Sequence, residues 1–408
     1  MRQTLIPYGQ HLIEEDDIAA VSAVLRSGPL TQGPQVGAFE EAIAQITQAQ
    51  YATATHSGTS ALHLALRALD VGPGDRVWTS PISFVASANC ALYCGATVDF
   101  VDIDPITHNL CPHALAQKLA QHARTHTLPR VLIPVHLSGR PCDMAAIAET
   151  CRAYGVAILE DASHALGATY NGKPIGACVY SDMTVFSFHP VKMITTGEGG
   201  LITTNNPQWK NTLDQLRSHG VTRDQTQFQH HDTPDFYYEQ QHLGYNYRMC
   251  DLQAALGRSQ VPKLQRFLAQ RRQHADTYHS ALAHLPVQRP PRDTDNTSSW
   301  HLYVITFADD SPPSPHVRSR RDHIYYALQS HNIMCSLHYY PIHCQPYYQK
   351  MGFQIGDFPH AERYGRTALT LPLFVQLTTD QITRIVEHLT QALNTAPERV
   401  KEKNKGKE

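Results

Sequence analysis

The alternation of short apolar runs with helical stretches between about residues 50 and 250 constrains the fold of this chain more than any other feature. Runs such as Arg130–Val135 and Val156–Leu159 are rich in β-branched residues and are typical of strands buried on both faces of a parallel sheet. Cys142–Tyr154 lies between them and follows Pro141, which favours the start of a helix. The alternation predicts an α/β fold with a mostly parallel central sheet, whose ligands bind at the carboxyl ends of the strands.

The length of 408 residues exceeds what one hydrophobic core usually supports, so we expect two domains. Residues 286–297 are rich in Pro, Asp and Thr and predict a connection, beyond which Trp300–Phe307 predicts a strand and Arg321–His331 a helix. Residues 221–240 are polar without a clear period and predict a long loop. The predicted division is an N-terminal segment with a large domain over 1–260, a smaller C-terminal α+β domain over 261–395, and a disordered tail over 396–408.

The composition argues against several classes of partner. Lys and Arg number 34 and Asp and Glu 36, so the net charge of −2 gives no reason to expect nucleic acid or an anionic membrane. No apolar run is long enough to span a bilayer, and the N-terminus lacks the pattern of a secretory signal. The nine Cys contain no CxxC pair and are interpreted as reduced thiols of a cytoplasmic protein. The 25 His show no ligand spacing, so we predict no metal site.

The segment Thr55–Leu69 is the first candidate for chemistry. Ser57 is a good N-cap residue, Gly58 allows close approach of the backbone, and apolar residues then recur at helical spacing. A turn of this kind at a helix N-terminus offers N–H groups and hydroxyls to an anion such as phosphate. Most such turns are simply helix caps, so this segment alone decides nothing.

Two charged residues follow apolar runs further along the chain. Asp161 stands where the strand that contains Val156–Leu159 should end. It is either a cap of a following helix or a partner for a cation such as a protonated pyridine nitrogen. Lys192 follows the apolar run around Phe186 and precedes a Gly-Glu-Gly-Gly turn. It is either a surface charge or a desolvated amine with a lowered pKa that forms a Schiff base.

The order of these pieces favours one cofactor. Pyridoxal phosphate needs an anion site, a partner for its pyridinium nitrogen and an amine that forms an imine. The phosphate anchor, Asp161 and Lys192 supply these groups in the expected order, with room between the last two for a helix and a strand. We therefore predict pyridoxal 5′-phosphate as the cofactor.

Several collinear blocks resemble one family. The chain is similar over about residues 4–393 to the DegT/DnrJ/StrS family, the fold-type I pyridoxal-phosphate aminotransferases that act on nucleotide-linked sugars. Within that family, SPISFVASAN, FSFHPVK and LHYYPIH look most like the branch that serves pseudaminic acid biosynthesis. The blocks include GPLTQGPQVGAFEEAIA (28–44), SGTSALHLAL (57–66), SPISFVASANC (80–90), EDASHALGATYNGKPIG (160–176), FSFHPVKMITTGEGG (186–200) and GYNYRMCDLQAALGRSQ (244–260).

The resemblance implies roles at the cofactor. Lys192 would hold the cofactor covalently and then act as the base and acid that moves protons. Asp161 would pair with the pyridine nitrogen, and His164 would contact the side of the cofactor's 3-hydroxyl group. The remaining cofactor-binding residues would be Gly58, Thr59 and Ser187 at the phosphate and Phe84 on the pyridine ring.

The resemblance also implies a homodimer with shared active sites. Asn246 would reach the phosphate of the cofactor bound by the partner subunit. Gly58, Ser187 and Asn246 would also lie near the substrate. The rest of the sugar-nucleotide site would be lined by Tyr8, Gly28, Pro29, Leu30, Thr31, His338, Tyr339 and Tyr340.

Four of these assignments have ordinary structural alternatives. Phe84 is also typical of an apolar core, and His164 of a helix histidine with satisfied partners. Asn246 is also typical of a turn, given Gly244 close by. The Tyr-rich segment 338–341 is also typical of packing next to a proline.

The implied reaction moves the amino group of L-glutamate to C4 of a UDP-linked 4-keto-6-deoxy-N-acetylhexosamine, UDP-2-acetamido-2,6-dideoxy-β-L-arabino-hex-4-ulose. Three alternatives stay open. The first is another keto-sugar, of the bacillosamine, perosamine or 4-amino-arabinose type. The second is a pyridoxal-phosphate sugar dehydratase, although such enzymes typically have histidine at the position of Lys192. The third is a catalytically silent sensor or scaffold with this fold.

Overall fold

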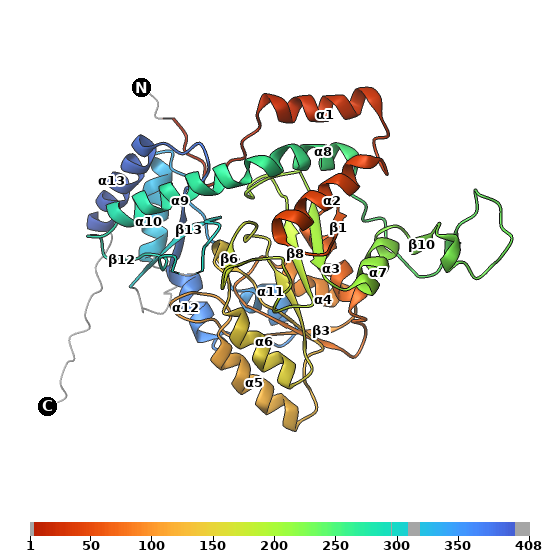
Figure 1. The fold of residues 1–408 in the computed structure, drawn as a ribbon. Helices are drawn as coiled ribbons and strands as arrows, with labels where there is room; N and C mark the ends of the chain where they lie inside the picture. The colour runs from red at the N-terminus through yellow and green to blue at the C-terminus, as the bar shows by residue number, and fades with distance from the viewer. Residues whose placement is uncertain (1–3, 295, 309–318, 396–408) are drawn as a thin grey trace.

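A seven-stranded sheet forms the centre of the protein, whose computed structural model describes residues 4–294, 296–308 and 319–395 (Figure 1). Neighbouring strands from β8 to β3 run parallel, and β9 runs antiparallel to both β1 and β8. This confirms the predicted α/β class with a mostly parallel sheet. In spatial order the strands are β1 (Tyr51–Thr55), β9 (Gly200–Thr204), β8 (Met183–Ser187), β5 (Ala157–Asp161), β4 (Val131–Ile133), β2 (Arg76–Thr79) and β3 (Thr97–Phe100).

Both faces of this sheet are buried, as the continuous apolar runs predict. Val77 and Ile133 pack into one hydrophobic cluster, and Trp78 and Leu132 into another. The two clusters lie on opposite faces because successive side chains of a strand alternate in direction. Strands β4 and β5 lie where the two apolar runs predict them.

Helices supply the other half of each cluster. The predicted helix Cys142–Tyr154 is α6 (Met144–Ala153), which Asp143 caps at its N-terminus. Residues of α3 (Gly58–Ala68) and α4 (Ala86–Tyr93) belong to the first cluster. Residues of α2 (Pro34–Thr47), α5 (Pro112–Arg124) and α6 belong to the second. The remaining helices of this part are α1 (Glu15–Ser27), α7 (Pro207–Arg217) and α8 (Asp251–Gln260).

A three-stranded antiparallel sheet organises the C-terminal part. The predicted strand Trp300–Phe307 is β13 (Tyr303–Phe307), and the predicted helix Arg321–His331 is α10 (Arg320–Ser330). A third hydrophobic cluster joins this sheet to its helices. The other elements here are α9 (Leu264–Ala281), β12 (Val287–Gln288), α11 (Pro346–Gln349), α12 (Pro359–Thr367), β14 (Ala368–Leu371) and α13 (Thr379–Thr395).

The predicted loop 221–240 is a projecting arm with little regular structure (Figure 1). Its ends pair as β10 (Val221–Thr222) and β11 (Glu239–Gln240). A short antiparallel pair consists of β6 (Thr169–Tyr170) and β7 (Lys173–Pro174). Within the described residues, no helix has the length and apolar character needed to cross a membrane. The predicted disordered tail 396–408 lies outside the described residues.

Candidate active site

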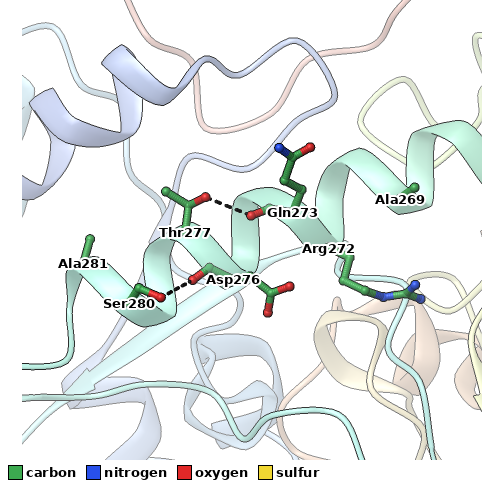
Figure 2. A pocket seen from close by; sticks show the side chains of 7 residues that line it. All are labelled: Ala269, Arg272, Gln273, Asp276, Thr277, Ser280 and Ala281. Atoms are coloured by element: carbon green, nitrogen blue, oxygen red, sulfur yellow. Dashed lines mark hydrogen bonds between the residues drawn. The ribbon is translucent and has the colours of Figure 1, made fainter.

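A cavity of about 570 Å³ lies at the carboxyl ends of β5 and β8, beside the N-terminus of α3. A larger hollow of about 810 Å³ runs along α9, but all its lining residues belong to that one helix surface (Figure 2). The smaller cavity therefore contains the candidate chemistry. Ten of the predicted site residues line it: Tyr8, Gly58, Thr59, Phe84, Asp161, His164, Ser187, Lys192, His338 and Tyr339.

The N-terminus of α3 forms one side of the cavity. Ser57 caps the helix, since its Oγ accepts the N–H of Ser60 at 3.1 Å. The N–H groups of Gly58 and Thr59 precede the first intrahelical bonds, so they remain for an anion. A Cβ atom at Gly58 would lie 3.0 Å from the Cβ of Ser187, so glycine keeps this corner open. Backbone donors and the Ser187 hydroxyl thus form a cradle of hydrogen-bond donors that suits an anion such as phosphate.

Asp161 is the last residue of β5 and faces the cavity. The hydroxyl of Ser87 donates to its Oδ2 at 2.5 Å, and the N–H of Ser163 donates to its Oδ1 at 3.1 Å. The alternative that Asp161 caps a following helix is wrong, because residues 162–168 form turns. Its carboxylate is therefore available to a cationic group in the cavity.

The neighbouring Glu160 is buried on the opposite face of the strand and has a structural role. His136 Nε2 donates to Oε2 of Glu160 at 2.7 Å, and the hydroxyls of Ser181 and Thr184 donate to Oε1. Burial raises the pKa of Glu160, but these hydrogen bonds outweigh it and hold the pKa below its ordinary value. His136 Nδ1 accepts the N–H of Cys142 at 3.0 Å, so both ring nitrogens of this buried imidazole are hydrogen bonded. Glu160 is thus satisfied within the protein.

Lys192 lies between β8 and β9 and lines the cavity. Burial lowers the pKa of its amine to about 8, while the charges of Asp161 and Glu198 act in the opposite direction. About one-tenth of such an amine is uncharged at pH 7, against far less for an ordinary lysine. The structure therefore favours a reactive amine over a surface charge.

Aromatic side chains form the wall beyond Lys192. His164 Nε2 and the hydroxyl of Tyr339 are hydrogen bonded at 3.0 Å, and the ring of His301 packs 4.4 Å from that of His164. Burial lowers the pKa of His164, with the charge of Lys192 adding to the effect. Burial likewise lowers the pKa of His338 to about 4. These imidazoles are neutral at pH 7, so they act as hydrogen-bonding groups rather than as cations.

The structural alternatives for two of these residues are wrong. Phe84 is 58% exposed at the cavity mouth, so it is not a core residue. His164 lies in a turn rather than in a helix, and its Nδ1 atom is buried without a hydrogen-bond partner among the described residues. Because His164 lines the cavity, this nitrogen is free to form a hydrogen bond with a bound ligand.

The cavity of one chain does not include every residue predicted at the site. Asn246 is exposed and forms an isolated bridge with Ser218. Tyr340 is 48% exposed and lies outside the lining. The other residues outside the lining are Gly28, Pro29, Leu30 and Thr31, which are exposed ahead of α2.

Three lining or supporting residues were missed by the sequence reasoning. Ser87 follows Ser83 by one helical turn, and their hydroxyls lie 2.7 Å apart, a spacing that a search for paired hydroxyls would have found. Glu198 lies in the Gly-Glu-Gly-Gly turn after Lys192, where the sequence alone points to a turn and not to a place in the cavity lining. His301 reaches the cavity from the C-terminal part, and no local motif marks it.

A separate cluster contains potential metal ligands. His343, Cys344 and Glu362 are buried, with their ligand atoms within 4.8 Å of one another. Sequence spacing gave no sign of this cluster. Glu362 Oε1, however, is hydrogen bonded to His343 Nε2 at 3.1 Å and accepts the N–H of Gly356 at 2.6 Å. Glu362 Oε1 and His343 Nε2 are therefore already hydrogen bonded within the protein.

The cavity fits pyridoxal phosphate in donor chemistry. The cradle of Gly58, Thr59 and Ser187 suits a phosphate, Asp161 suits a pyridinium nitrogen, and the Lys192 amine suits an aldehyde. The orphaned Nδ1 of His164 adds a buried polar atom that such a ligand could satisfy.

Comparisons with known proteins agree with this chemistry. The family described as the DegT/DnrJ/EryC1/StrS aminotransferase family matches residues 11–390. The spore coat polysaccharide biosynthesis protein SpsC of Bacillus subtilis is 37% identical over 388 residues, which cover 95% of this chain and 96% of SpsC.

Solved structures are similar over almost the whole chain. Spr1654 of Streptococcus pneumoniae in its PMP form has a TM-score of 0.87 and 30% identity, with 96% of this chain and 98% of that one covered. It was also solved in a PLP form. Helicobacter pylori PseC, an aminotransferase involved in the biosynthesis of pseudoaminic acid, has a TM-score of 0.86 and 28% identity, with 96% and 100% covered. The chain therefore belongs to the DegT/DnrJ/EryC1/StrS aminotransferase family and is a sugar aminotransferase that uses pyridoxal phosphate.

Proposed function

We propose that this aminotransferase moves the amino group of L-glutamate to C4 of UDP-2-acetamido-2,6-dideoxy-β-L-arabino-hex-4-ulose, a step of pseudaminic acid biosynthesis. The observation that carries the amino transfer is the cavity in which Lys192, with its lowered pKa, lies among the cofactor donors. The similarity to Helicobacter pylori PseC and the blocks SPISFVASAN, FSFHPVK and LHYYPIH support this choice of sugar. The nine free cysteines support a cytoplasmic setting.

Lys192 would move the protons. Pyridoxal phosphate, when bound, stabilises the negative charge that develops on carbon as a proton leaves. The Lys192 amine would take the proton from the α-carbon of glutamate and, in the second half-reaction, return a proton to C4 of the sugar. Its lowered pKa suits both directions, since a group that titrates near the working pH both accepts and donates readily.

The other residues of the site would hold and orient the cofactor and the sugar nucleotide. Asp161 would keep a proton on the pyridine nitrogen, and the Ser87 hydroxyl would in turn orient the Asp161 carboxylate. The free Nδ1 atom of His164 would form a hydrogen bond on the side of the cofactor's 3-hydroxyl group, and Phe84 would cover the pyridine ring. Tyr8, together with the 338–340 segment, would lie along the sugar nucleotide.

We also propose a homodimer with shared active sites. Asn246 is exposed and does not line the cavity of its own chain, which is consistent with a role at the partner's phosphate site. The exposed segment 28–31 would likewise reach the sugar nucleotide only in the assembled dimer.

The test is an absorbance scan of the purified protein with L-glutamate and then with the UDP-linked keto-sugar. The visible band of the bound cofactor should bleach with glutamate and return with the sugar. Lys192→Ala should show no such cycle, and Lys173→Ala, a change at an exposed lysine of β7, should behave as wild type. A band that bleaches but returns only with another keto-sugar would refute the proposed substrate. No response to glutamate would refute the proposed donor.

A further inference from the structure

Arg271 lies on α9 with its side chain only 1% exposed. Its Nη1 donates to the backbone carbonyls of Trp300 and His301, each at 3.3 Å, and of Leu373 at 3.1 Å. No ion pair in the described part of the chain includes this guanidinium, and burial lowers its pKa to about 10. Removing a cation from water without a counter-ion is costly, so the contacts that it makes should matter to the molecule.

Two of these carbonyls belong to segments that reach the active-site cavity. His301 lines the cavity and packs against His164. The N–H of Leu373 donates to the carbonyl of Tyr8 at 3.1 Å, and Tyr8 also lines the cavity. The Arg271 guanidinium therefore connects two parts of the cavity lining that are far apart in the sequence. One is the His301 wall, and the other is the Tyr8 wall, in which Tyr8 is hydrogen bonded to Leu373.

The same face of α9 also makes two contacts with residues on either side of Leu373, which belongs to the Tyr8 wall. His274 Nε2 lies 3.3 Å from the carbonyl of Val375, and the hydroxyl of Tyr278 donates to the carbonyl of Pro372 at 2.9 Å. Residues 271, 274 and 278 lie on one helix face, because their spacing matches the helical repeat. Arg271 is the member of this row that also reaches the His301 segment.

We propose that Arg271 is a positioning residue that fixes the Tyr8 wall relative to the His301 wall and so sets the width of the keto-sugar site. It would contact neither cofactor nor substrate. His164 would keep its place without Arg271, since Tyr339 holds its ring and Ser299 donates to its carbonyl. Loss of Arg271 should therefore impair the half-reaction with the keto-sugar and leave the half-reaction with glutamate intact. This inference rests on the proposed function for the identity of the sugar.

The test compares Arg271→Met, which keeps length but has no donor, with Arg271→Lys and with Arg272→Met. Arg272 is the exposed neighbour on the same helix and serves as the matched control (Figure 2). In Arg271→Met the KM for the keto-sugar should rise between about 10- and 100-fold, while the rate of the glutamate half-reaction stays within about twofold. Arg271→Lys should restore part of the loss, and Arg272→Met should match wild type.

Hydrogen exchange of the cofactor-free protein gives a readout that needs no substrate. In Arg271→Met the amide of Leu373 should exchange faster, because the carbonyl of the same residue loses the Arg271 donor that holds this segment in place, while amides of β5 keep their wild-type rates. An unchanged KM for the keto-sugar in both Arg271 variants would overturn the proposal. It would also be overturned if the rates of both half-reactions fell equally and amides throughout the chain exchanged faster. If Arg271→Met does not fold, Arg271→Lys decides by the same readouts. A failure of the wild type to use the sugar would refute the proposed function and leave the exchange test in force.

Discussion

In the proposed mechanism the charge state of Lys192 controls attachment of the cofactor, since only an uncharged amine attacks an aldehyde. Burial lowers its pKa to about 8. Cofactor-free protein should therefore take up pyridoxal phosphate about tenfold faster for each pH unit up to about 8, and the rate should then level off. Uptake measured by stopped-flow absorbance between pH 6 and 10 tests this. A rate that keeps rising to pH 10 would assign an ordinary lysine pKa instead.

A variant at Glu198 tests whether a neighbouring charge shifts the pKa of Lys192, in comparison with the uptake profile of the wild type. The negative charge of Glu198 raises the pKa of Lys192, although less than burial lowers it. Glu198→Gln should thus move the break in the uptake profile to lower pH. A break that stays in place would mean that this carboxylate does not act on the amine.

Ser87 is the second residue with a testable role, because its hydroxyl donates to Asp161 at 2.5 Å. A hydrogen bond to a charged group contributes about 1.5–3 kcal/mol, so its loss leaves the Asp161 carboxylate less firmly placed opposite the proposed position of the pyridine nitrogen. Ser87→Ala should slow the glutamate half-reaction about tenfold or more. Single-turnover bleaching measures the rate, and Ser87→Thr should restore it. Equal rates in Ser87→Ala and wild type would contradict the role.

Some of these residues could be predicted and others could not, for a physical reason. Lys192 and Asp161 stand directly beside apolar strands, where a charge is costly, so local sequence marks them. Ser87 acts on a carboxylate 74 positions away, and His301 enters the site from the C-terminal part. Such contacts depend on the assembled fold, which no local pattern encodes.

At the scale of elements, the start of β9 packs against the proposed phosphate cradle. A Cβ at Gly200 would lie 2.2 Å from the carbonyl oxygen of Ser57, a backbone atom that cannot move without shifting the start of α3. Gly200→Ala should therefore destabilise the protein by about 1–3 kcal/mol and raise the dissociation constant for pyridoxal phosphate at least about tenfold. Thermal denaturation and a cofactor titration measure the two effects.

Gly37→Ala is the control, because an added Cβ there meets nothing within 4 Å in the exposed first turn of α2. That variant should gain about 0.5–1 kcal/mol of stability and bind the cofactor as wild type does. Gly200→Ala with unchanged cofactor affinity would show that the cradle tolerates displacement.

Element boundaries followed local signals closely. The Ser57 cap, α6 and the strand that ends at Asp161 lie within about two residues of their predicted positions, since caps, proline and apolar runs act locally. The alternative of a helix directly after Asp161 was wrong because tertiary contacts direct the chain elsewhere. The N–H of Ala162 donates to Val185 of the neighbouring strand, and Gly167 at a φ of +82° turns the chain towards β6.

At the scale of the whole molecule, a shared active site predicts complementation between two defective subunits. If Lys192 of one subunit works with Asn246 of its partner, then Lys192→Ala and Asn246→Ala protein should each lose activity as pure dimers. A mixed dimer would combine both changes in one site and leave the other site intact, because a two-fold axis pairs each site with residues from both chains.

Equal amounts of the two variants, unfolded and refolded together, should therefore regain about one-quarter of wild-type activity, since half the dimers are mixed and each has one intact site. Each variant refolded alone is the control. If Lys192 and Asn246 served one site within a single chain, every site of a mixed dimer would carry one of the two changes. The mixture would then have only the average activity of its parents, and the role of Asn246 at the partner's phosphate would be refuted.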